Sequence, residues 1–285
     1  MRVLIVGCGY VGLPLGGALA GLGHEVHGLR RSTNAHAEME ESGIMPHAID
    51  ITRREQLDNL PGPFDWIINT VSSGRGGAEA YHGIFVVGTR NLLDWFASSP
   101  SQKYLFTSST SVYGQTDGSW VDEDSPTEPS GETGRTLLET ESLALSIGGV
   151  VLRLSGIYGP ERGHLYRQFL KGEAVMTGNP SRWMNMIHRD DVMGCILAAM
   201  ETAGPGTVLN ATDNEPVTQQ DFFQWLADQL DRPLPPQETE VASCKRAQTN
   251  KRVANSRARE ILSWTPKYPT WREGYAKLME LEGVL

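Results

Sequence analysis

The first half of the chain alternates short apolar runs with segments of helical spacing. This alternation is typical of a parallel sheet that is covered by helices on both faces. The strands expected from the apolar runs are Val3–Val6, Glu25–Leu29, Met45–Ile49, Trp66–Asn69, Tyr104–Thr107 and Val150–Leu154. The helices expected between them are Val11–Leu22, Gly83–Ala97 and Thr136–Ile147.

The pattern loosens after Gly159-Pro160, where longer helices alternate with irregular segments. The helices expected there are His164–Lys171, Asp191–Glu201, Gln219–Leu230, Asn255–Leu262 and Trp271–Leu281. Thr218 should cap one of them, and the proline-rich stretch Pro233–Pro236 should be a loop. The pattern predicts an α/β fold: a Rossmann-type doubly wound parallel sheet, residues 1–160, with a smaller C-terminal α/β substrate lobe, residues 161–285. The boundary is soft, because some strands and helices of the lobe should return to the main sheet.

Bulk composition narrows the partners and the compartment. The 285 residues carry a net charge of −9, which disfavours nucleic acid as a partner. No apolar run is long enough to span a bilayer, so no membrane partner is expected. The three cysteines, Cys8, Cys195 and Cys244, are scattered without metal-ligand spacing, and they fit a reducing cytoplasm. A small-molecule substrate is the expected partner, and the sequence does not decide between a monomer and a homodimer.

A glycine-rich turn follows the first strand and opens the first helix. In Gly7-Cys8-Gly9-Tyr10-Val11-Gly12, the first glycine should make the tight turn and the second should let the backbone approach a pyrophosphate. The third should permit close contact between helix and strand. The helix N-terminus then offers N–H groups and the positive end of a dipole to the phosphates. The six residues therefore predict a dinucleotide site, in which Cys8 is a small apolar filler.

The end of the second strand bears on which dinucleotide is bound. A carboxylate there would bind the ribose of NAD, whereas this chain has Arg30 and Arg31. Guanidinium groups match a phosphate in geometry and charge, so the pair favours NADP(H) over NAD(H). The alternative is a solvated pair of arginines on a loop. Asp50 either accepts a hydrogen bond from the adenine amino group or caps the next helix.

The ordered motifs together resemble the extended short-chain dehydrogenase/reductase superfamily, known as NAD-dependent epimerases/dehydratases. Beyond the glycine turn, these motifs are Val87–Leu93, Phe106–Gly114, Arg153–Pro160, Asn185–Val192 and Lys251–Arg257. The resemblance covers nearly the whole chain. Phe106–Gly114 without a following Tyr-x-x-x-Lys is similar to a small atypical branch, the YeeZ-like bacterial proteins.

The resemblance implies roles for individual residues. Ser109 takes the position of the side chain that binds the substrate oxygen. Thr133 and Leu137 take the places of the tyrosine that serves as the general acid/base and of its activating lysine, and neither can do that chemistry. No tyrosine or lysine occurs between Ser125 and Leu145. Further cofactor contacts are expected at Ile51, Thr70, Val71, Ser108, Ser155 and Ile157.

Several residues are candidates to replace the missing proton donor. Tyr113 either donates the proton or packs in the substrate pocket. Tyr81 and His82 follow the glycine-rich loop Ser72–Gly77, which falls at the carboxyl edge of the sheet, and either could act as acid/base or merely begin a helix. His188 and Asp191 match a motif that mostly ties down the C-terminal lobe. Arg135 either binds a substrate anion or points to water, and the residues expected to line the pocket are Trp120, Arg162, His164, Arg182 and Trp183.

Two functions of different classes remain open at this point. One is an atypical NADP(H)-dependent oxidoreductase or epimerase on a carbonyl or nucleotide-sugar-like substrate. The other is a catalytically silent dinucleotide sensor or regulatory protein, which the missing acid/base pair favours. A lyase or isomerase that uses no dinucleotide is a third hypothesis. No metal is expected at the site.

Overall fold

The computed structural model describes residues 1–73, 77–98, 103–238 and 249–284. Residues 74–76 of the glycine-rich loop and Cys244 therefore lie outside the described residues. The chain forms two compact units, each built from several segments. The first unit comprises Met1–Val112, Pro129–Arg153 and Ala199–Val208, and the second comprises Tyr113–Glu128, Leu154–Ala198 and Leu209–Leu285.

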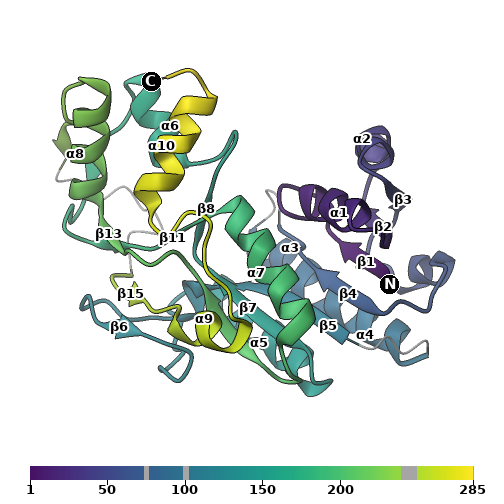
Figure 1. Ribbon diagram of the computed structural model, residues 1–285. Helices are drawn as coiled ribbons and strands as arrows, with labels where there is room; N and C mark the ends of the chain where they lie inside the picture. Colours follow the sequence, from purple (N-terminus) through teal and green to yellow (C-terminus); the bar gives the residue numbers. More distant parts are fainter. Residues whose placement is uncertain (74–76, 99–102, 239–248, 285) are drawn as a thin grey trace. The chain divides into compact units, whose positions relative to one another are not determined.

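The fold is built on a seven-stranded sheet with the strand order β12-β7-β5-β4-β1-β2-β3 (Figure 1). Its strands are β1 (Arg2–Val6), β2 (Glu25–Arg30), β3 (Ile44–Ala48), β4 (Trp66–Asn69), β5 (Lys103–Ser109), β7 (Val150–Leu154) and β12 (Val208–Ala211). β1 pairs in parallel with β2 and β4, so that Val3 lies opposite both Val26 and Trp66. The order reverses at β1, which is the hallmark of a doubly wound sheet. The predicted α/β fold class is confirmed.

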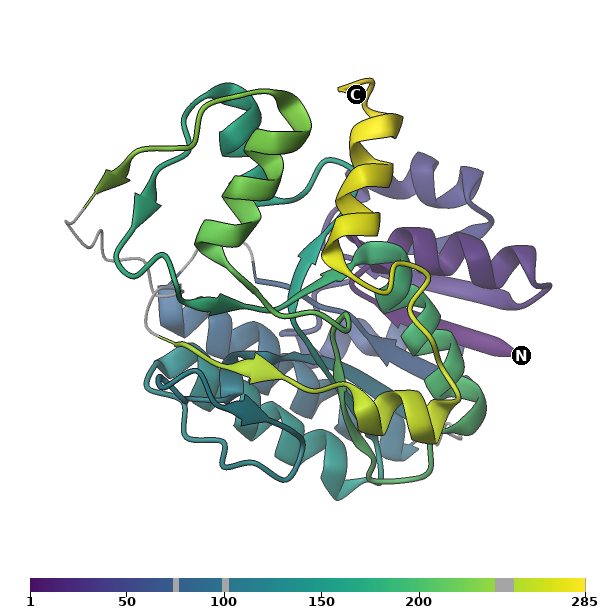
Figure 2. The ribbon, with the colours of Figure 1, turned by 60° about the vertical axis from the view of Figure 1, so that its left-hand side comes forward.

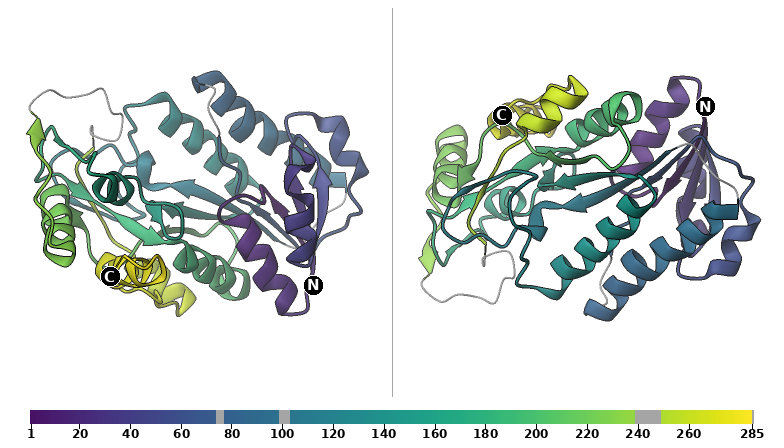
Figure 3. Two further views of the ribbon diagram at one scale, coloured as in Figure 1. Left: turned by 90° about the horizontal axis from the view of Figure 1, so that it is seen from above. Right: turned by 90° about the horizontal axis from the view of Figure 1, so that it is seen from below.

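Helices cover both faces of this sheet in the first unit. α1 (Gly12–Gly21) and α2 (His36–Glu41) lie on one face, and α4 (Gly88–Ser98) and α5 (Glu132–Ser146) run side by side on the other (Figure 3). α3 (Gly77–His82) leads into α4 through a π-helical turn, Gly83–Val87. The predicted helix Gly83–Ala97 is therefore a π turn followed by α4. Short 3-10 turns occur at Thr33–Ala35, Arg54–Asn59 and Thr110–Val112.

The second unit joins short strand pairs to three helices around its own core. Its strands pair as β6 (Trp120–Val121) with β15 (Arg252–Val253), β8 (Gly156–Tyr158) with β11 (Met186–His188), β9 (Met176–Thr177) with β14 (Gln237–Glu238), and β10 (Trp183–Met184) with β13 (Val217–Thr218). The remaining helices of the chain are α6 (His164–Lys171), α7 (Arg189–Thr202), α8 (Gln219–Leu230), α9 (Ser256–Leu262) and α10 (Trp271–Leu281). Figure 2 shows α6, α8 and α10 in the same part of the second unit.

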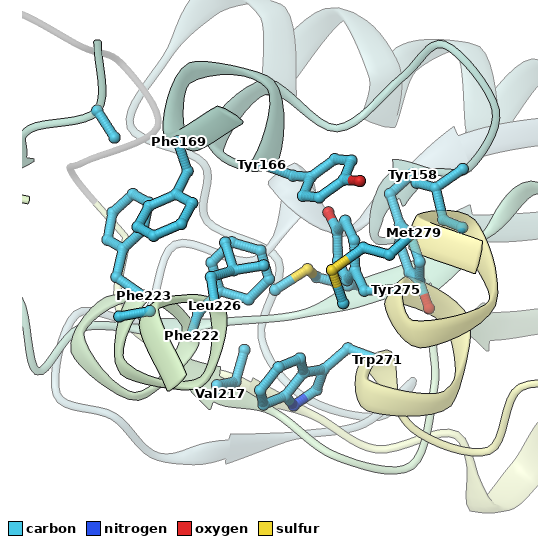
Figure 4. Packing of buried hydrophobic residues seen from close by; sticks show 14 of the residues in the cluster. Tyr158, Tyr166, Phe169, Val217, Phe222, Phe223, Leu226, Trp271, Tyr275 and Met279 are labelled. Carbon is cyan, nitrogen blue, oxygen red and sulfur yellow. The ribbon is translucent and has the colours of Figure 1, made fainter. Parts of the chain in front are cut away.

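Aromatic side chains form the core between these three helices (Figure 4). Tyr158 stacks on Tyr275 with their ring centroids 4.2 Å apart, and Phe222 packs edge-on against Trp271. Gly274 is required beside them, because a Cβ at this position would lie 2.7 Å from Cζ of Tyr158. Thr218 caps α8 as predicted, since its hydroxyl accepts from the Asp221 amide at 3.0 Å. Within the described residues, no helix is both long and apolar enough to cross a membrane.

Candidate functional site

Two glycines of the turn after β1 are required by the fold itself. Gly7 has φ +96°, and a Cβ there would lie 2.9 Å from the backbone of Val71 at the end of β4. A Cβ at Gly12 would lie 2.8 Å from the Thr70 hydroxyl and would overlap the Gly7 carbonyl. Only glycine avoids these backbone clashes. The first and third glycines therefore set the tight turn and the close contact between helix and strand, as the motif predicts.

Gly9 differs, because the protein leaves space around it. A Cβ at Gly9 would meet only the Gly7 carbonyl, at an ordinary 3.9 Å. The α1 helix that follows has no side-chain cap and no acidic residue in its first turn. A bare backbone beside an uncapped helix N-terminus is the arrangement that accepts a diphosphate. The glycine turn thus fits the phosphates of a dinucleotide, and Gly9 is the position that packing within the protein does not explain.

The residues between the glycines pack inward or line the turn. Cys8 is fully buried, and burial raises the pKa of its thiol to about 12, so the thiol stays protonated. Its amide donates to the Leu29 carbonyl at 3.0 Å. Val11 is buried and Tyr10 is half-buried. Cys8 is therefore a small apolar filler and not a nucleophile.

The two arginines at the end of β2 differ in exposure. Arg30 is half-buried and close enough to influence the Cys8 thiol electrostatically, whereas Arg31 is exposed. Neither guanidinium has a hydrogen bond or ion pair within the part of the chain that the structure describes. Both therefore keep their donors available for an anion.

The residues after β3 and β4 complete this edge of the first unit. Asp50 Oδ1 accepts from both the amide and the hydroxyl of Thr52, at 3.0 and 2.8 Å, and does not cap the 3-10 turn Arg54–Asn59. Ile51 is buried, and its side chain occupies the space where a Cβ at Gly88 would lie. The Thr70 hydroxyl donates to the Gly7 carbonyl at 2.9 Å. Thr70 and Val71 thus hold the glycine turn in place.

A buried polar triad lies under the end of β5. Ser108 Oγ donates to Glu141 Oε1 at 2.5 Å, and Arg153 Nη2 donates to Glu141 Oε2 at 2.8 Å. The Glu141 and Arg153 side chains are only 3% and 8% exposed. Sequence reasoning missed Glu141 and the role of Arg153. The available signal was an arginine inside the apolar run Val150–Leu154, because a charge in a buried strand needs a partner.

Ser109 follows this triad at the last position of β5. Its hydroxyl oxygen accepts from the Ser111 amide at 3.2 Å, and its hydrogen has no acceptor among the described residues. On α5, Thr133 is half-buried in the first turn and Leu137 is 2% exposed. Ser109 therefore keeps a donor for a ligand, while Leu137 contributes packing alone.

Tyr113 belongs to the second unit, where its side chain is fully buried. Its hydroxyl donates to Asn210 Oδ1 at 2.9 Å, and its carbonyl accepts from Lys251 Nζ at 3.0 Å. Burial and, to a lesser extent, the charge of Arg182 lower the pKa of the Lys251 ammonium to about 8. The phenol proton of Tyr113 is thus already used in a buried hydrogen bond.

Tyr81, His82 and Arg135 gather around the helices α3 and α5 of the first unit. Tyr81 stacks on Phe85 at 4.3 Å, and burial raises the pKa of its phenol to about 12. His82 and Arg135 line an open hollow of about 340 Å³ together with Ala78, Glu79, Glu132, Thr136 and Glu139. His82 Nε2 lies 3.6 Å from a Glu139 oxygen. The His82 side chain is exposed at this hollow, so solvent reaches it.

His188 and Asp191 are buried in the second unit. Asp191 accepts from the amides of Lys267 and Tyr268, and burial raises the pKa of its carboxyl to about 6. His188 Nδ1 accepts from the Asp190 amide at 3.1 Å, and burial lowers the pKa of its imidazole to about 4. Both residues hold backbone segments together, which is the structural role that their motif suggests.

The remaining predicted residues also lie in the second unit. Ser155 Oγ donates to Thr212 Oγ1 at 3.0 Å, and Ile157 lies opposite Ile187 in the β8–β11 pair. Trp120 is 54% exposed, and Trp183 is half-buried. Among the described residues, no cluster of histidine, cysteine and carboxylate side chains could hold a metal ion.

Comparison with known proteins identifies the kind of molecule to which this site belongs. Residues 3–211 match the model of the NAD dependent epimerase/dehydratase family. The chain is 30% identical to protein YeeZ of Escherichia coli strain K12 over 217 residues, which cover 73% of this chain and 76% of YeeZ. It is 27% identical to a 3-diazoavenalumate denitrifying reductase of a Streptomyces species, over 97% of this chain and 100% of that protein.

A solved structure gives the same result for the fold. A protein of Methylobacillus flagellatus, assigned to the NAD-dependent epimerases/dehydratases, superposes with a TM-score of 0.80 and is 32% identical. The match covers 99% of this chain and 98% of that one. The likeness therefore extends beyond the dinucleotide-binding sheet.

Proposed function

The chain belongs to the NAD-dependent epimerase/dehydratase family, and from that premise we propose that it is an NADP(H)-dependent oxidoreductase or epimerase. Its substrate would be a carbonyl compound or a nucleotide-sugar-like molecule. The observation that carries the proposal is Gly9, which has no side chain although no contact among the described residues requires a glycine there. A diphosphate bound at the N-terminus of α1 would explain this glycine, because the phosphates must approach the backbone closely.

Different residues of the first unit would bind different groups of the cofactor. The amides of the glycine turn and of the first turn of α1 would take the diphosphate. Arg30 and Arg31 would take a 2′-phosphate, because their donors are uncommitted within the described chain. The nicotinamide supplies hydride chemistry when it is bound.

Substrate activation would rest on Ser109, whose hydroxyl hydrogen has no acceptor among the residues described. It would donate to the substrate carbonyl oxygen and favour negative charge there. The raised pKa makes the Tyr81 phenol a weak acid, and Tyr113 already donates to Asn210. Water or His82 is therefore the simpler proton source of this proposal.

A second candidate function has its own observation. Leu137 is almost fully buried where an activating lysine would stand in an ordinary member of the superfamily. A protein that keeps the dinucleotide turn but lacks this cation could sense the cofactor without turning over a substrate. Binding and turnover therefore have to be measured separately.

Calorimetric titration with NADPH and NADH tests the binding half of the proposal. The Gly9→Ala variant should fold normally, because its new methyl group meets only one atom at van der Waals distance. It should nevertheless bind at least about tenfold more weakly, a loss of ~1.4 kcal/mol or more. Gly21→Ala is the matched control, since it lies on α1 with nothing within 4 Å of the added Cβ. If the unmodified protein binds neither nucleotide, the proposal is wrong.

Two further comparisons test cofactor choice and turnover. Removing both guanidinium groups with Arg30→Ala and Arg31→Ala should weaken NADPH binding by tenfold or more, because each lost charged hydrogen bond costs about 1.5–3 kcal/mol. The same variant should bind NADH as tightly as the unmodified protein does. The absorbance of the reduced nicotinamide should fall when a member of a carbonyl panel is added, and Ser109→Ala should slow this reaction. Binding without turnover on any panel member would favour the sensor.

A further inference from the structure

An arginine that contacts two tryptophan rings is a feature of the second unit that the dinucleotide site does not explain. The Arg252 guanidinium lies 5.2 Å from the ring centroid of Trp120 and 5.2 Å from that of Trp183. Three short strands bring them together: β15 carries Arg252, β6 carries Trp120 and β10 carries Trp183. β15 and β6 pair in parallel with Arg252 opposite Trp120, and Figure 2 shows them side by side.

The surrounding backbone fixes this arrangement. Arg252 Nε donates to the Gly118 carbonyl at 2.8 Å. Gly118 has φ +80°, and a Cβ there would lie 3.3 Å from Cδ1 of Trp183, so glycine lets the indole pack against the loop. Asn250 Oδ1 accepts from the Trp183 amide at 2.9 Å. Two ring contacts and one backbone hydrogen bond therefore position the guanidinium before any ligand binds.

The two outer nitrogens of the guanidinium, Nη1 and Nη2, take no part in these contacts. The two cation–π contacts use no N–H hydrogen bond, and the bond to Gly118 uses Nε–H alone. Within the described residues, neither Nη1 nor Nη2 has a hydrogen bond or ion pair, although the side chain is half-buried. Asp117, which precedes Gly118 in the chain, accepts hydrogen bonds from both the amide and the hydroxyl of Ser119 through Oδ1. A fork of donors held rigidly and left unpaired matches a carboxylate or a phosphate.

The two indole rings beside Arg252 favour a ligand that has an aromatic ring. A single exposed indole needs no explanation. Trp120, however, is 54% exposed while one of its faces covers Arg252. A flat ring that lies beside the indole would bury apolar area and bring its own anionic group to the fork. Lys251 and Arg182 add positive charge to this part of a chain whose net charge is −9.

The two ring contacts have a structural role as well. Through cation–π interactions they help to hold β15 against β6 and β10. That role uses the charge of the guanidinium and leaves Nη1 and Nη2 open to solvent, since neither is a buried atom. Water at these donors can therefore be exchanged for an anion.

We propose that Trp120, Arg252 and Trp183 form a recognition site for a planar aromatic anion, whose carboxylate or phosphate is bound by the Arg252 fork. The proposal deepens the proposed function and rests on it for the step after binding, because it states the class of substrate that the reductase would accept. Binding itself needs no dinucleotide. The preorganised guanidinium lowers the entropy lost when the ligand binds.

The test uses the full chain without added nucleotide and measures binding by calorimetry. The aromatic carboxylate is 4-hydroxycinnamate, the aromatic phosphate is uridine diphosphate, and cyclohexanecarboxylate and 4-hydroxybenzyl alcohol lack the ring and the charge respectively. We expect one of the first two to bind and to identify the anionic group, and we expect both controls to bind at least tenfold more weakly. If neither aromatic anion binds, or if the neutral alcohol binds equally well, the proposal is overturned.

Variants locate the binding. Arg252→Met and Trp120→Leu should each weaken the aromatic anion at least tenfold, and Arg252→Lys should weaken it too, because lysine lacks the fork. Arg259→Met is the matched control, since it removes an exposed arginine of α9 in the same unit. Unchanged affinity in Arg252→Lys and Trp120→Leu would refute the assignment, even if Arg252→Met does not fold.

The same proteins separate this proposal from the proposed function. NADPH binding belongs to the glycine turn of the first unit and should be unchanged in Arg252→Lys and Trp120→Leu. If the unmodified protein binds the aromatic anion but no nucleotide, the proposed function fails and the recognition site stands. If it binds nucleotide but no aromatic anion, the recognition site fails and the proposed function stands.

Discussion

Removing Glu141 should destabilise the protein far more than removing a surface glutamate of the same helix. Glu141 and Arg153 are 3% and 8% exposed, and the carboxylate accepts from both Arg153 and Ser108. Glu141→Ala would leave a buried guanidinium without its counter-charge, which costs about 3–5 kcal/mol. The Ser108 hydroxyl would lose its acceptor as well, at about 1–3 kcal/mol. Such a loss is a large part of a typical total stability of about 5–15 kcal/mol.

Glu139→Ala provides the control within the same helix. Its carboxylate binds Arg90 at 2.7 Å, but the two side chains are 42% and 55% exposed. An exposed ion pair of this kind contributes about 0–1 kcal/mol. The comparison therefore isolates burial, because the residue type, the helix and the substitution are the same.

Urea unfolding followed by far-ultraviolet circular dichroism measures both effects as shifts of the transition midpoint. Replacing the whole pair, as Glu141→Leu with Arg153→Met, should recover most of the loss, since no charge then remains buried. The reasoning is refuted if Glu141→Ala costs no more than Glu139→Ala. It is also refuted if the double variant is less stable than Glu141→Ala alone.

Three further predictions concern the second unit. Burial in the folded state lowers the pKa of Lys251 to about 8, whereas the unfolded value is about 10.4. Between these pH values the unfolded state binds more protons, so the free energy of unfolding should rise with pH across this window. Lys251→Met should flatten the rise of the urea midpoint with pH. Gly274→Ala should lower the melting temperature steeply, because its Cβ would overlap the Tyr158 ring, whereas Gly21→Ala in open space should not. Thr270→Ala should cost about 1 kcal/mol in urea unfolding, because it removes the hydroxyl that accepts from the Arg272 amide in the capping box that opens α10.

Long apolar runs made the main sheet predictable. Trp66–Asn69 and Val150–Leu154 are strands with the bounds that the runs predict, and Met45–Ile49 is shifted by one residue. In contrast, several strands of the second unit are only two residues long, which is too short for any period to appear. β12 was missed as well, although Gly204-Pro205-Gly206 marks a turn just before it. Local pattern thus identifies elements that bury a full face, and it misses pairs that exist only through their neighbours.

In the candidate site too, the motif residues could be predicted from the sequence and their distant partners could not. The glycine turn could be predicted because its spacing is a sequence motif, and Gly7 and Gly12 also meet backbone demands of the fold. The partners of Ser108 and of Arg252 could not, because Glu141 and Trp183 come from distant segments and carry no motif. Side-chain pairs of this kind follow from packing, which a single sequence does not display.

The order in which the chain visits its two units bears on how the protein is made. Ala199–Val208 belongs to the first unit, whereas Leu154–Ala198 before it belongs to the second. A ribosome releases the chain from the N-terminus, so the glycine turn emerges early and waits for a late segment. The sheet therefore cannot reach its final form until residue 211, the last residue of β12, has left the exit tunnel. Nascent chains arrested before that point should remain sensitive to protease, and those arrested well beyond it should not.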